Sequence, residues 1–130
     1  KKLISLLKEF SIKNPNINII YNPKNIWISM LKNDVIICSS GLTKYETILL
    51  GLPSIIFCAN KEQEKNNRGF KKKNICITID NMKKRSEIKK TIKNFLQNFN
   101  QRKKFLYKSK KIIDLNGANR VLKIIENLKN

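Results

Sequence analysis

The sequence predicts an α/β fold, a Rossmann-like parallel sheet of about four strands followed by C-terminal helices. Short and nearly unbroken apolar runs alternate with helical patterns between residues 17 and 79, and such runs are typical of strands buried on both faces. The connections between these runs are short, as in doubly wound sheets. With 130 residues and 41% hydrophobic content, the chain is expected to fold as a single domain.

Four segments are expected to form the sheet. They are residues 17–21, 34–40, 54–59 and 75–79. Helices are expected before and between them, at residues 1–10, 25–33, 43–50 and 61–74. In the second of these helices, the side chains expected to face inward are Ile26, Trp27, Met30 and Leu31.

Two residues are expected to end the helix at 43–50. Gly51 fits the left-handed position that follows many helices, and Pro53 stops any continuation. Beyond Asp80 the alternation ends, and apolar residues recur at helical spacing in three further segments. Residues 81–130 are therefore expected to be a helical part of the same domain.

The chain is strongly basic, with 28 Lys and Arg against 9 Asp and Glu and a formal charge of +19. One interpretation is a surface for nucleic acid or another polyanion. The other is a composition rich in lysine, because only four of the basic residues are Arg and aromatic residues are not interleaved with them. No specific nucleic-acid partner is expected.

The cysteine and histidine content restricts the chemistry. Cys38, Cys58 and Cys76 each lie within an apolar run without CxxC spacing, so they are expected to be buried core residues rather than disulfides or zinc ligands. The chain has no His, so any imidazole base must come from elsewhere. No acidic cluster suggests a metal site, and no cofactor is expected.

The segment after the second expected strand has the features of an anion-binding turn. Gly41 permits close approach of the backbone, and the hydroxyls of Ser40 and Thr43 can donate hydrogen bonds. A helix that begins at Thr43 presents free N–H groups and the positive end of its dipole. Glu46, one turn later, could accept two hydrogen bonds from a vicinal diol such as ribose. Alternatively, Glu46 could form a capping box with Thr43.

A second polar group follows the third expected strand. Gln63 and Asn66 lie one helical turn apart, and their amides could bridge sugar hydroxyls or phosphate oxygens. The alternative is an ordinary solvated start of a helix.

These motifs together resemble the C-terminal half of a GT-B fold nucleotide-sugar enzyme. The family pattern GG-x-T-x-x-E, LG-x-P and Q-x-x-N is similar to residues 40–46, 51–53 and 63–66 here. Within that fold, the sequence looks most like the hydrolases that release UDP from a 2,4-diacetamido-2,4,6-trideoxyhexose in pseudaminic acid biosynthesis, with their spore-coat polysaccharide relatives. "DLNGANRVLKII", residues 114–125, resembles their closing DG-x-GA-x-R segment.

The resemblance implies a UDP-sugar site. Ser40, Gly41 and Thr43 would face the diphosphate, with Leu42 in the same loop, and Glu46 would hold the ribose. Gln63 and Asn66 would reach toward the sugar or its phosphate. The sequence departs from the pattern at Ser40, which replaces a glycine, at Leu42, which replaces a small polar residue, and at Leu115, which also replaces a glycine.

The resemblance also implies that parts of the enzyme lie outside this sequence. The family's first strand of this half, a second Gly-rich turn and the N-terminal domain with its water-activating histidine have no counterpart here. We therefore expect a cytoplasmic fragment without a transmembrane segment, which carries the nucleotide-binding half and does not hydrolyse substrate alone.

Three alternatives stay open at this point. One is a glycosyltransferase, since the loop is also similar to that of the lipid-linked N-acetylglucosamine transferases of cell-wall synthesis. Another is a basic binding module that uses residues 71–73, 83–90 and 102–111. The third is a nonfunctional gene piece.

Overall fold

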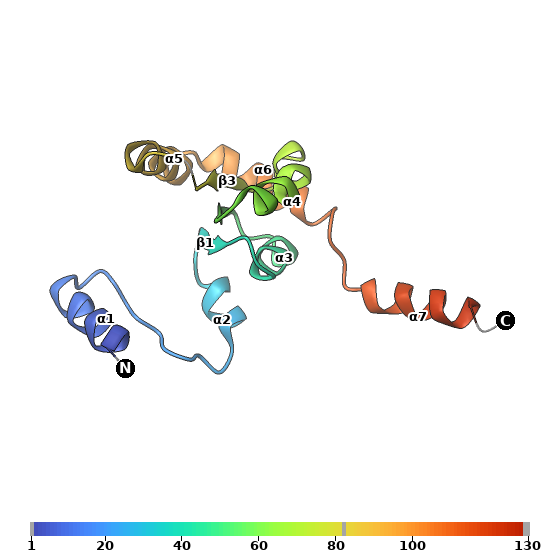
Figure 1. Cartoon of the computed structure of the whole chain (residues 1–130), viewed down its shortest axis with the longest axis horizontal. Helices are drawn as coiled ribbons and strands as arrows, with labels where there is room; N and C mark the ends of the chain where they lie inside the picture. Colours follow the sequence, from blue (N-terminus) through green and yellow to red (C-terminus); the bar gives the residue numbers. More distant parts are fainter. Residues whose placement is uncertain (1, 82, 129–130) are drawn as a thin grey trace.

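The computed structural model describes residues 2–81 and 83–128, and Figure 1 shows the path of the chain. The helices are α1 (Lys2–Lys13), α2 (Ile26–Leu31), α3 (Thr43–Leu49), α4 (Lys61–Lys72), α5 (Arg85–Gln97), α6 (Phe99–Ser109) and α7 (Gly117–Asn127). The strands are β1 (Ile36–Ser39), β2 (Ser54–Cys58) and β3 (Ile77–Asp80).

The three strands form one parallel sheet in the order β1-β2-β3. Ile37 pairs with Ile55, and Ile55 pairs with Ile77. The predicted α/β class and parallel sheet are therefore confirmed, with strands close to the expected segments 34–40, 54–59 and 75–79. The prediction of about four strands is wrong, because the described residues form three.

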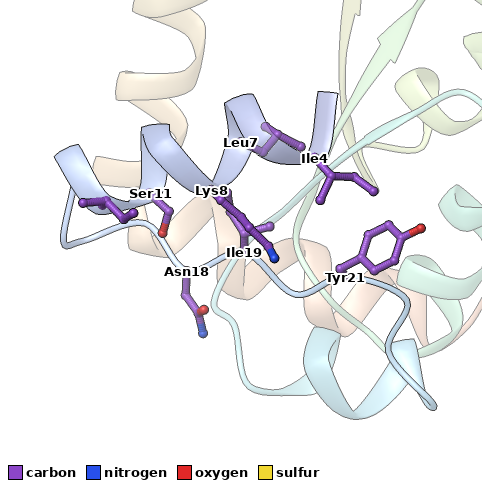
Figure 2. Close-up of a pocket in the computed structure, with 8 residues that line it drawn as sticks. Ile4, Leu7, Lys8, Ser11, Asn18, Ile19 and Tyr21 are labelled. Carbon is purple, nitrogen blue, oxygen red and sulfur yellow. The ribbon is translucent and has the colours of Figure 1, made fainter. Parts of the chain in front are cut away.

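The expected strand at residues 17–21 is absent. This segment follows α1 in an irregular conformation, and Ser11 Oγ donates a hydrogen bond of 2.7 Å to the carbonyl oxygen of Ile17. Some of its side chains, including Ile19 and Tyr21, line a groove of about 320 Å³ against α1 (Figure 2). An apolar pattern predicts a strand only if another strand is available for pairing, and β1 pairs here with β2 alone.

The main hydrophobic core lies between the sheet and helices α5 and α6. Ile55 and Ile79 pack there with Phe95 and Phe105, and each of the four is at most 3% exposed. The two phenylalanine rings are 5.4 Å apart between centroids. Full burial of such side chains stabilises the fold by about 1.5–3 kcal/mol each.

Helices α3 and α4 pack on the other face of the sheet. The hydroxyl oxygens of Thr47 in α3 and Ser54 in β2 lie 3.4 Å apart, and Asn67 of α4 contacts Cys58 of the same strand. These helices follow β1 and β2 directly, so the sheet positions the first turn of each helix at its carboxyl edge.

Three helices contribute little to this core. Only Met30 of α2 is buried, while Ile26, Trp27 and Leu31 are about half exposed, so the expectation that all four face inward is wrong. The helix has six residues, and none of the described helices forms a layer over its outer side. Helices α1 and α7 lie apart from the central sheet (Figure 1). Among the described residues, no helix has the length and apolar character needed to cross a bilayer.

Candidate functional site at the carboxyl edge of the sheet

The polar segments that follow the strands meet at one edge of the sheet. Because the strands are parallel, the chain leaves β1, β2 and β3 on the same side. The segments that follow β2 and β3 contact each other directly, because Asn81 Nδ2 donates a hydrogen bond of 2.7 Å to the carbonyl oxygen of Ala59. This edge is where open α/β sheets bind ligands.

The loop between β1 and α3 begins as a continuation of the sheet. The Ser40 N–H donates a hydrogen bond of 3.0 Å to the Phe57 carbonyl, and Ser40 is buried. Gly41 is exposed, and a Cβ atom added there would come no closer to another side chain than 3.9 Å. The fold therefore does not need glycine at position 41 for packing, so the residue leaves space beside the backbone.

The capping box between Thr43 and Glu46 is absent. Thr43 is the first residue of α3, and the N-cap position is Leu42, which makes no side-chain capping bond. Leu42 is 80% exposed. Among the residues that the structure describes, no side chain accepts a hydrogen bond from the first N–H groups of this helix, so the capping-box explanation for the Thr43–Glu46 spacing is wrong.

Glu46 is half-buried and remains accessible. With Trp27 of α2 and Leu115 of the segment before α7, it lines a pocket of about 170 Å³ beside α3. Within the described residues its carboxylate makes no hydrogen bond or ion pair to another side chain. The pocket also lies against Leu49 and Leu50 at the end of α3, and its surface is apolar, so Glu46 contributes the aliphatic part of its side chain there. It is smaller than the ~300–1,000 Å³ of typical ligand sites.

The charges around Glu46 also act on a neighbouring thiol. Burial raises the pKa of Cys38, the negative charge of Glu46 raises it further, and Lys44 opposes them. Both charged groups therefore lie near the end of β1. All three cysteines are free. Cys58 and Cys76 are buried, which confirms the prediction for these two, whereas Cys38 is only half-buried and the prediction of a buried core residue is wrong there.

The start of α4 holds Gln63 in place. Asn60 accepts a hydrogen bond from the Gln63 N–H at 2.9 Å, and Gln63 Oε1 accepts one from the Ala59 N–H at 2.8 Å. The amide oxygen of Gln63 is therefore occupied by the turn after β2, and its NH₂ group is the part left for a ligand. Asn66 is exposed, and its side chain makes no hydrogen bond within the described residues.

Asn67 is the residue of this region that the sequence interpretation missed. It is 1% exposed, and its Nδ2 lies 2.6 Å from Ser40 Oγ and 2.7 Å from the Gln63 carbonyl oxygen. Its Oδ1 is buried and has no hydrogen-bond partner in the described part of the chain. The available signal was its spacing of four residues from Gln63, which places both on one helix face. Asn67 joins the two predicted polar groups.

Lys44 is a second unexpected feature. It is 4% exposed, and its Nζ lies 5.1 Å from the ring centroid of Tyr45 and 5.6 Å from that of Phe70. The two rings pack edge to face at 5.6 Å between centroids. Within the described part of the chain, its ammonium has no carboxylate within ion-pair distance. Its charge therefore lies against one ring from α3 and one ring from the last turn of α4.

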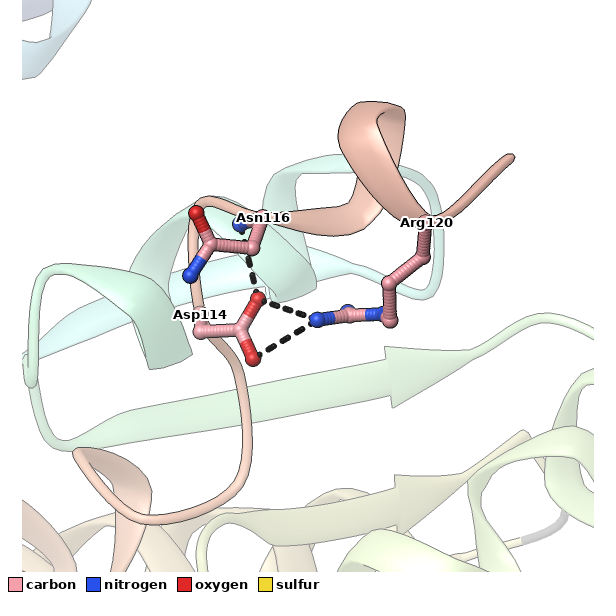
Figure 3. Close-up of polar contacts among 3 residues, drawn as sticks. All are labelled: Asp114, Asn116 and Arg120. Carbon is pink, nitrogen blue, oxygen red and sulfur yellow. Dashed lines mark hydrogen bonds and ion pairs between the residues drawn. The ribbon is translucent and has the colours of Figure 1, made fainter. Parts of the chain in front are cut away.

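The closing segment before α7 forms its own polar turn (Figure 3). Asp114 Oδ1 accepts hydrogen bonds from the Asn116 N–H at 2.8 Å and from Arg120 at 2.9 Å. The Asn116 N–H, followed by Arg120, lowers the pKa of Asp114. The turn places Leu115 beside Glu46. In the segment at residues 114–125, Leu115 is therefore the residue that lies near Glu46. Asp114 and Arg120 pair with each other instead.

The described residues contain no group of three or more His, Cys, Asp or Glu side chains able to hold a metal ion. The candidate site consists of the loop at Ser40–Thr43, Glu46, and the start of α4 with Gln63 and Asn67.

Comparison with known proteins gives little further guidance. No family model matches the chain, and no solved structure matches it. A segment of 72 residues, 55% of the chain, is 36% identical to part of an uncharacterized protein from Methanocaldococcus jannaschii. That match spans only 15% of the archaeal protein's length.

Proposed function

We propose that the chain is the UDP-binding half of a GT-B fold enzyme that hydrolyses a nucleotide sugar, with a 2,4-diacetamido-2,4,6-trideoxyhexose as the sugar. The observation that carries the proposal is the position of Glu46. Glu46 is half-buried, and within the described residues its carboxylate has no hydrogen-bond or ion-pair partner. It lies one turn after a loop whose N-cap residue makes no side-chain capping bond and whose glycine is not needed for packing.

In this proposal the two parts of UDP bind to different groups. The diphosphate lies against the N–H groups of Gly41, Leu42 and Thr43, where the α3 dipole and the buried Lys44 add positive potential. The ribose hydroxyls donate to Glu46. Gln63 offers its NH₂ group to the sugar or its phosphate, and Asn66 approaches only the solvent-facing part of the ligand.

The chemical contribution of this half is electrostatic. When the bond from the anomeric carbon to the diphosphate breaks, negative charge develops on the leaving oxygen. Backbone N–H groups already oriented toward that oxygen stabilise the charge without reorganising. In this proposal the general base belongs to a domain outside this sequence, so the isolated chain binds UDP without turning over substrate. The proposed location of the protein is the cytoplasm.

A glycosyltransferase is the second candidate, favoured by the exposed Leu42 in the loop, which is closer to the transferase pattern. It would use the same nucleotide contacts with an alcohol in place of water. A third candidate, a basic module for polyanions, is favoured by the charge of +19. Both nucleotide-sugar hypotheses predict that the loop after β1 binds UDP. The polyanion hypothesis predicts that the Lys-rich segments bind the ligand instead.

The proposal is tested by mapping ligands on ¹⁵N-labelled protein by NMR. Inorganic diphosphate is expected to shift the amide signals of Gly41, Leu42 and Thr43, and uridine those around Glu46. UDP is expected to shift both sets, with little change at moderately higher salt. Shifts restricted to the Lys-rich segments 71–73, 83–90 and 102–111, and lost steeply as salt rises, would instead support the polyanion module.

A further inference from the structure

The C-terminal limb, which we define as residues 102–128, combines a basic helix face with a separate apolar helix. Residues 102–111 contain six basic residues and no acidic one. Phe105 and Ser109 are buried against the body, while the lysine side chains around them are exposed. Those exposed side chains are Lys103, Lys104, Lys108, Lys110 and Lys111.

The second part of the limb, α7, has two chemically distinct sides. At about 100° per residue, its large apolar residues occupy one side and its polar residues the other. The apolar side chains are between 47% and 81% exposed: Val121, Leu122, Ile124, Ile125 and Leu128. An extended segment connects α6 to α7, which lies away from the sheet (Figure 1). The apolar side of α7 therefore has no covering element among the described residues.

We propose that the C-terminal limb docks this protein on an anionic lipid bilayer. The lysines of residues 102–111 contact the negatively charged headgroups, and the apolar side of α7 enters the boundary between headgroups and acyl chains. The binding of an amphipathic helix to a bilayer strengthens with the apolar area that it buries and with attraction to anionic lipids, and a basic segment near the surface adds to that attraction. The proposal uses none of the residues assigned to UDP.

Charge favours this occupant over a second copy of the chain and over nucleic acid. A second copy would bring another +19 charge to the contact, which disfavours close approach. Nucleic acid would satisfy the lysines but would leave the apolar side of α7 exposed to water. An anionic bilayer would pair with the lysines and would also cover the apolar side of α7. With 11 residues, α7 is about 16 Å long, which is too short to cross a bilayer core of about 30 Å, so it would lie in the plane of the interface.

The test is vesicle flotation with the full 130-residue chain. Vesicles of phosphatidylcholine with phosphatidylglycerol are expected to carry the protein, and vesicles of phosphatidylcholine alone are not. Ile125→Glu places a charge on the apolar side of α7, and Asn119→Glu places the same charge on the polar side as a matched control. Ile125→Glu is expected to lower partitioning about tenfold more than Asn119→Glu. Lys104→Glu with Lys108→Glu is expected to lower it by about tenfold or more.

Several outcomes would overturn the proposal. One is equal binding to charged and uncharged vesicles, and another is an equal loss in the two glutamate variants. A third is a dimer without vesicles, detected by sedimentation velocity and abolished by Ile125→Glu, because a second copy would then cover α7. Binding of RNA without vesicle binding would assign the lysines to nucleic acid. Since α7 lies outside the core, thermal melts of both variants are expected to match the parent chain, which excludes misfolding as the cause of a loss.

Discussion

At the scale of single residues, Asn67 connects the two parts of the candidate site. Its Nδ2 lies within hydrogen-bonding distance of Ser40 Oγ, the Gln63 carbonyl oxygen and Cys58 Sγ. An amide nitrogen carries only two hydrogens, so the oxygen contacts at 2.6 and 2.7 Å are favoured over the sulfur at 3.3 Å. Asn67 thereby fixes the loop after β1 to the first turns of α4.

Removing this amide should destabilise the fold. Asn67→Ala is expected to lower the free energy of unfolding by about 1–3 kcal/mol, because buried polar groups lose their partner. In a double-mutant cycle with Ser40→Ala, the two changes should be non-additive by at least about 0.5 kcal/mol. Asn66→Ala, on the exposed side of the same helix, is the control and should change stability by less than about 0.5 kcal/mol. Urea unfolding measures all four variants, and strict additivity would contradict the contact.

The buried thiols predict a fall in stability at alkaline pH. Burial raises the pKa of Cys76 to about 12, against 9.0 for an unperturbed thiol. Above pH 9 the unfolded chain loses this proton and the folded chain keeps it, so the free energy of unfolding falls as pH rises from about 9 to about 12. The slope approaches about 1.4 kcal/mol per pH unit. Urea unfolding at several pH values should show a shallower fall for Cys76→Ala, and an unchanged slope would refute the role of this thiol.

At the scale of secondary-structure elements, the turn after α3 sets the position of β2. The Gly51 N–H donates to the Ile48 carbonyl and the Leu52 N–H to the Thr47 carbonyl, which is the Schellman pattern. Gly51 has a φ of 72°, and a Cβ atom there would lie 2.9 Å from Leu106 of α6. This confirms the left-handed position predicted from the sequence. The turn carries the chain from the candidate site back to the amino end of the sheet.

Gly51→Ala should therefore be costly. Positive φ and the contact with Leu106 together are expected to lower the free energy of unfolding by about 1–3 kcal/mol. Gly69 offers a matched control, because it lies inside α4 and a Cβ atom there would have no neighbour within 4 Å. Gly69→Ala should stabilise the protein by about 0.5–1 kcal/mol. If both variants melted at the same temperature, the account of this turn would be wrong.

The elements also show why sequence patterns succeed or fail. The strands β1, β2 and β3 were predictable because each apolar run has a strand beside it and helices over it. Residues 17–21 have the same apolar character without a pairing partner, and Trp27 has the pattern of an inward side chain without a layer to cover it. The turn between β1 and α3, and the start of α3 at Thr43, were predictable from the position of Gly41 after an apolar run. The binding role of this loop and of Glu46 stays a prediction. The role of Asn67 was not, because it depends on a contact between residues 27 positions apart.

At the scale of the whole molecule, charge repulsion acts against the folded state. The formal charge is +19, and within the described residues a single ion pair, Asp114–Arg120, is found. Salt screens repulsion among exposed charges. The melting temperature is therefore expected to rise by a few degrees between low and physiological ionic strength, measured by circular dichroism with NaCl. A fall over that range would show that attractive pairs outweigh the repulsion.

The central claim about the whole molecule is that its sheet edge binds UDP through the loop after β1 and Glu46. Isothermal titration of the chain with UDP tests it most directly, with Glu46→Ala and, as a control, Glu87→Ala in the first turn of α5. The parent chain should bind UDP. Glu46→Ala should weaken binding by about 1–3 kcal/mol through the loss of charged hydrogen bonds, and Glu87→Ala should leave it unchanged. A parent chain that does not bind UDP, or a Glu46→Ala variant with the same Kd, would contradict the account.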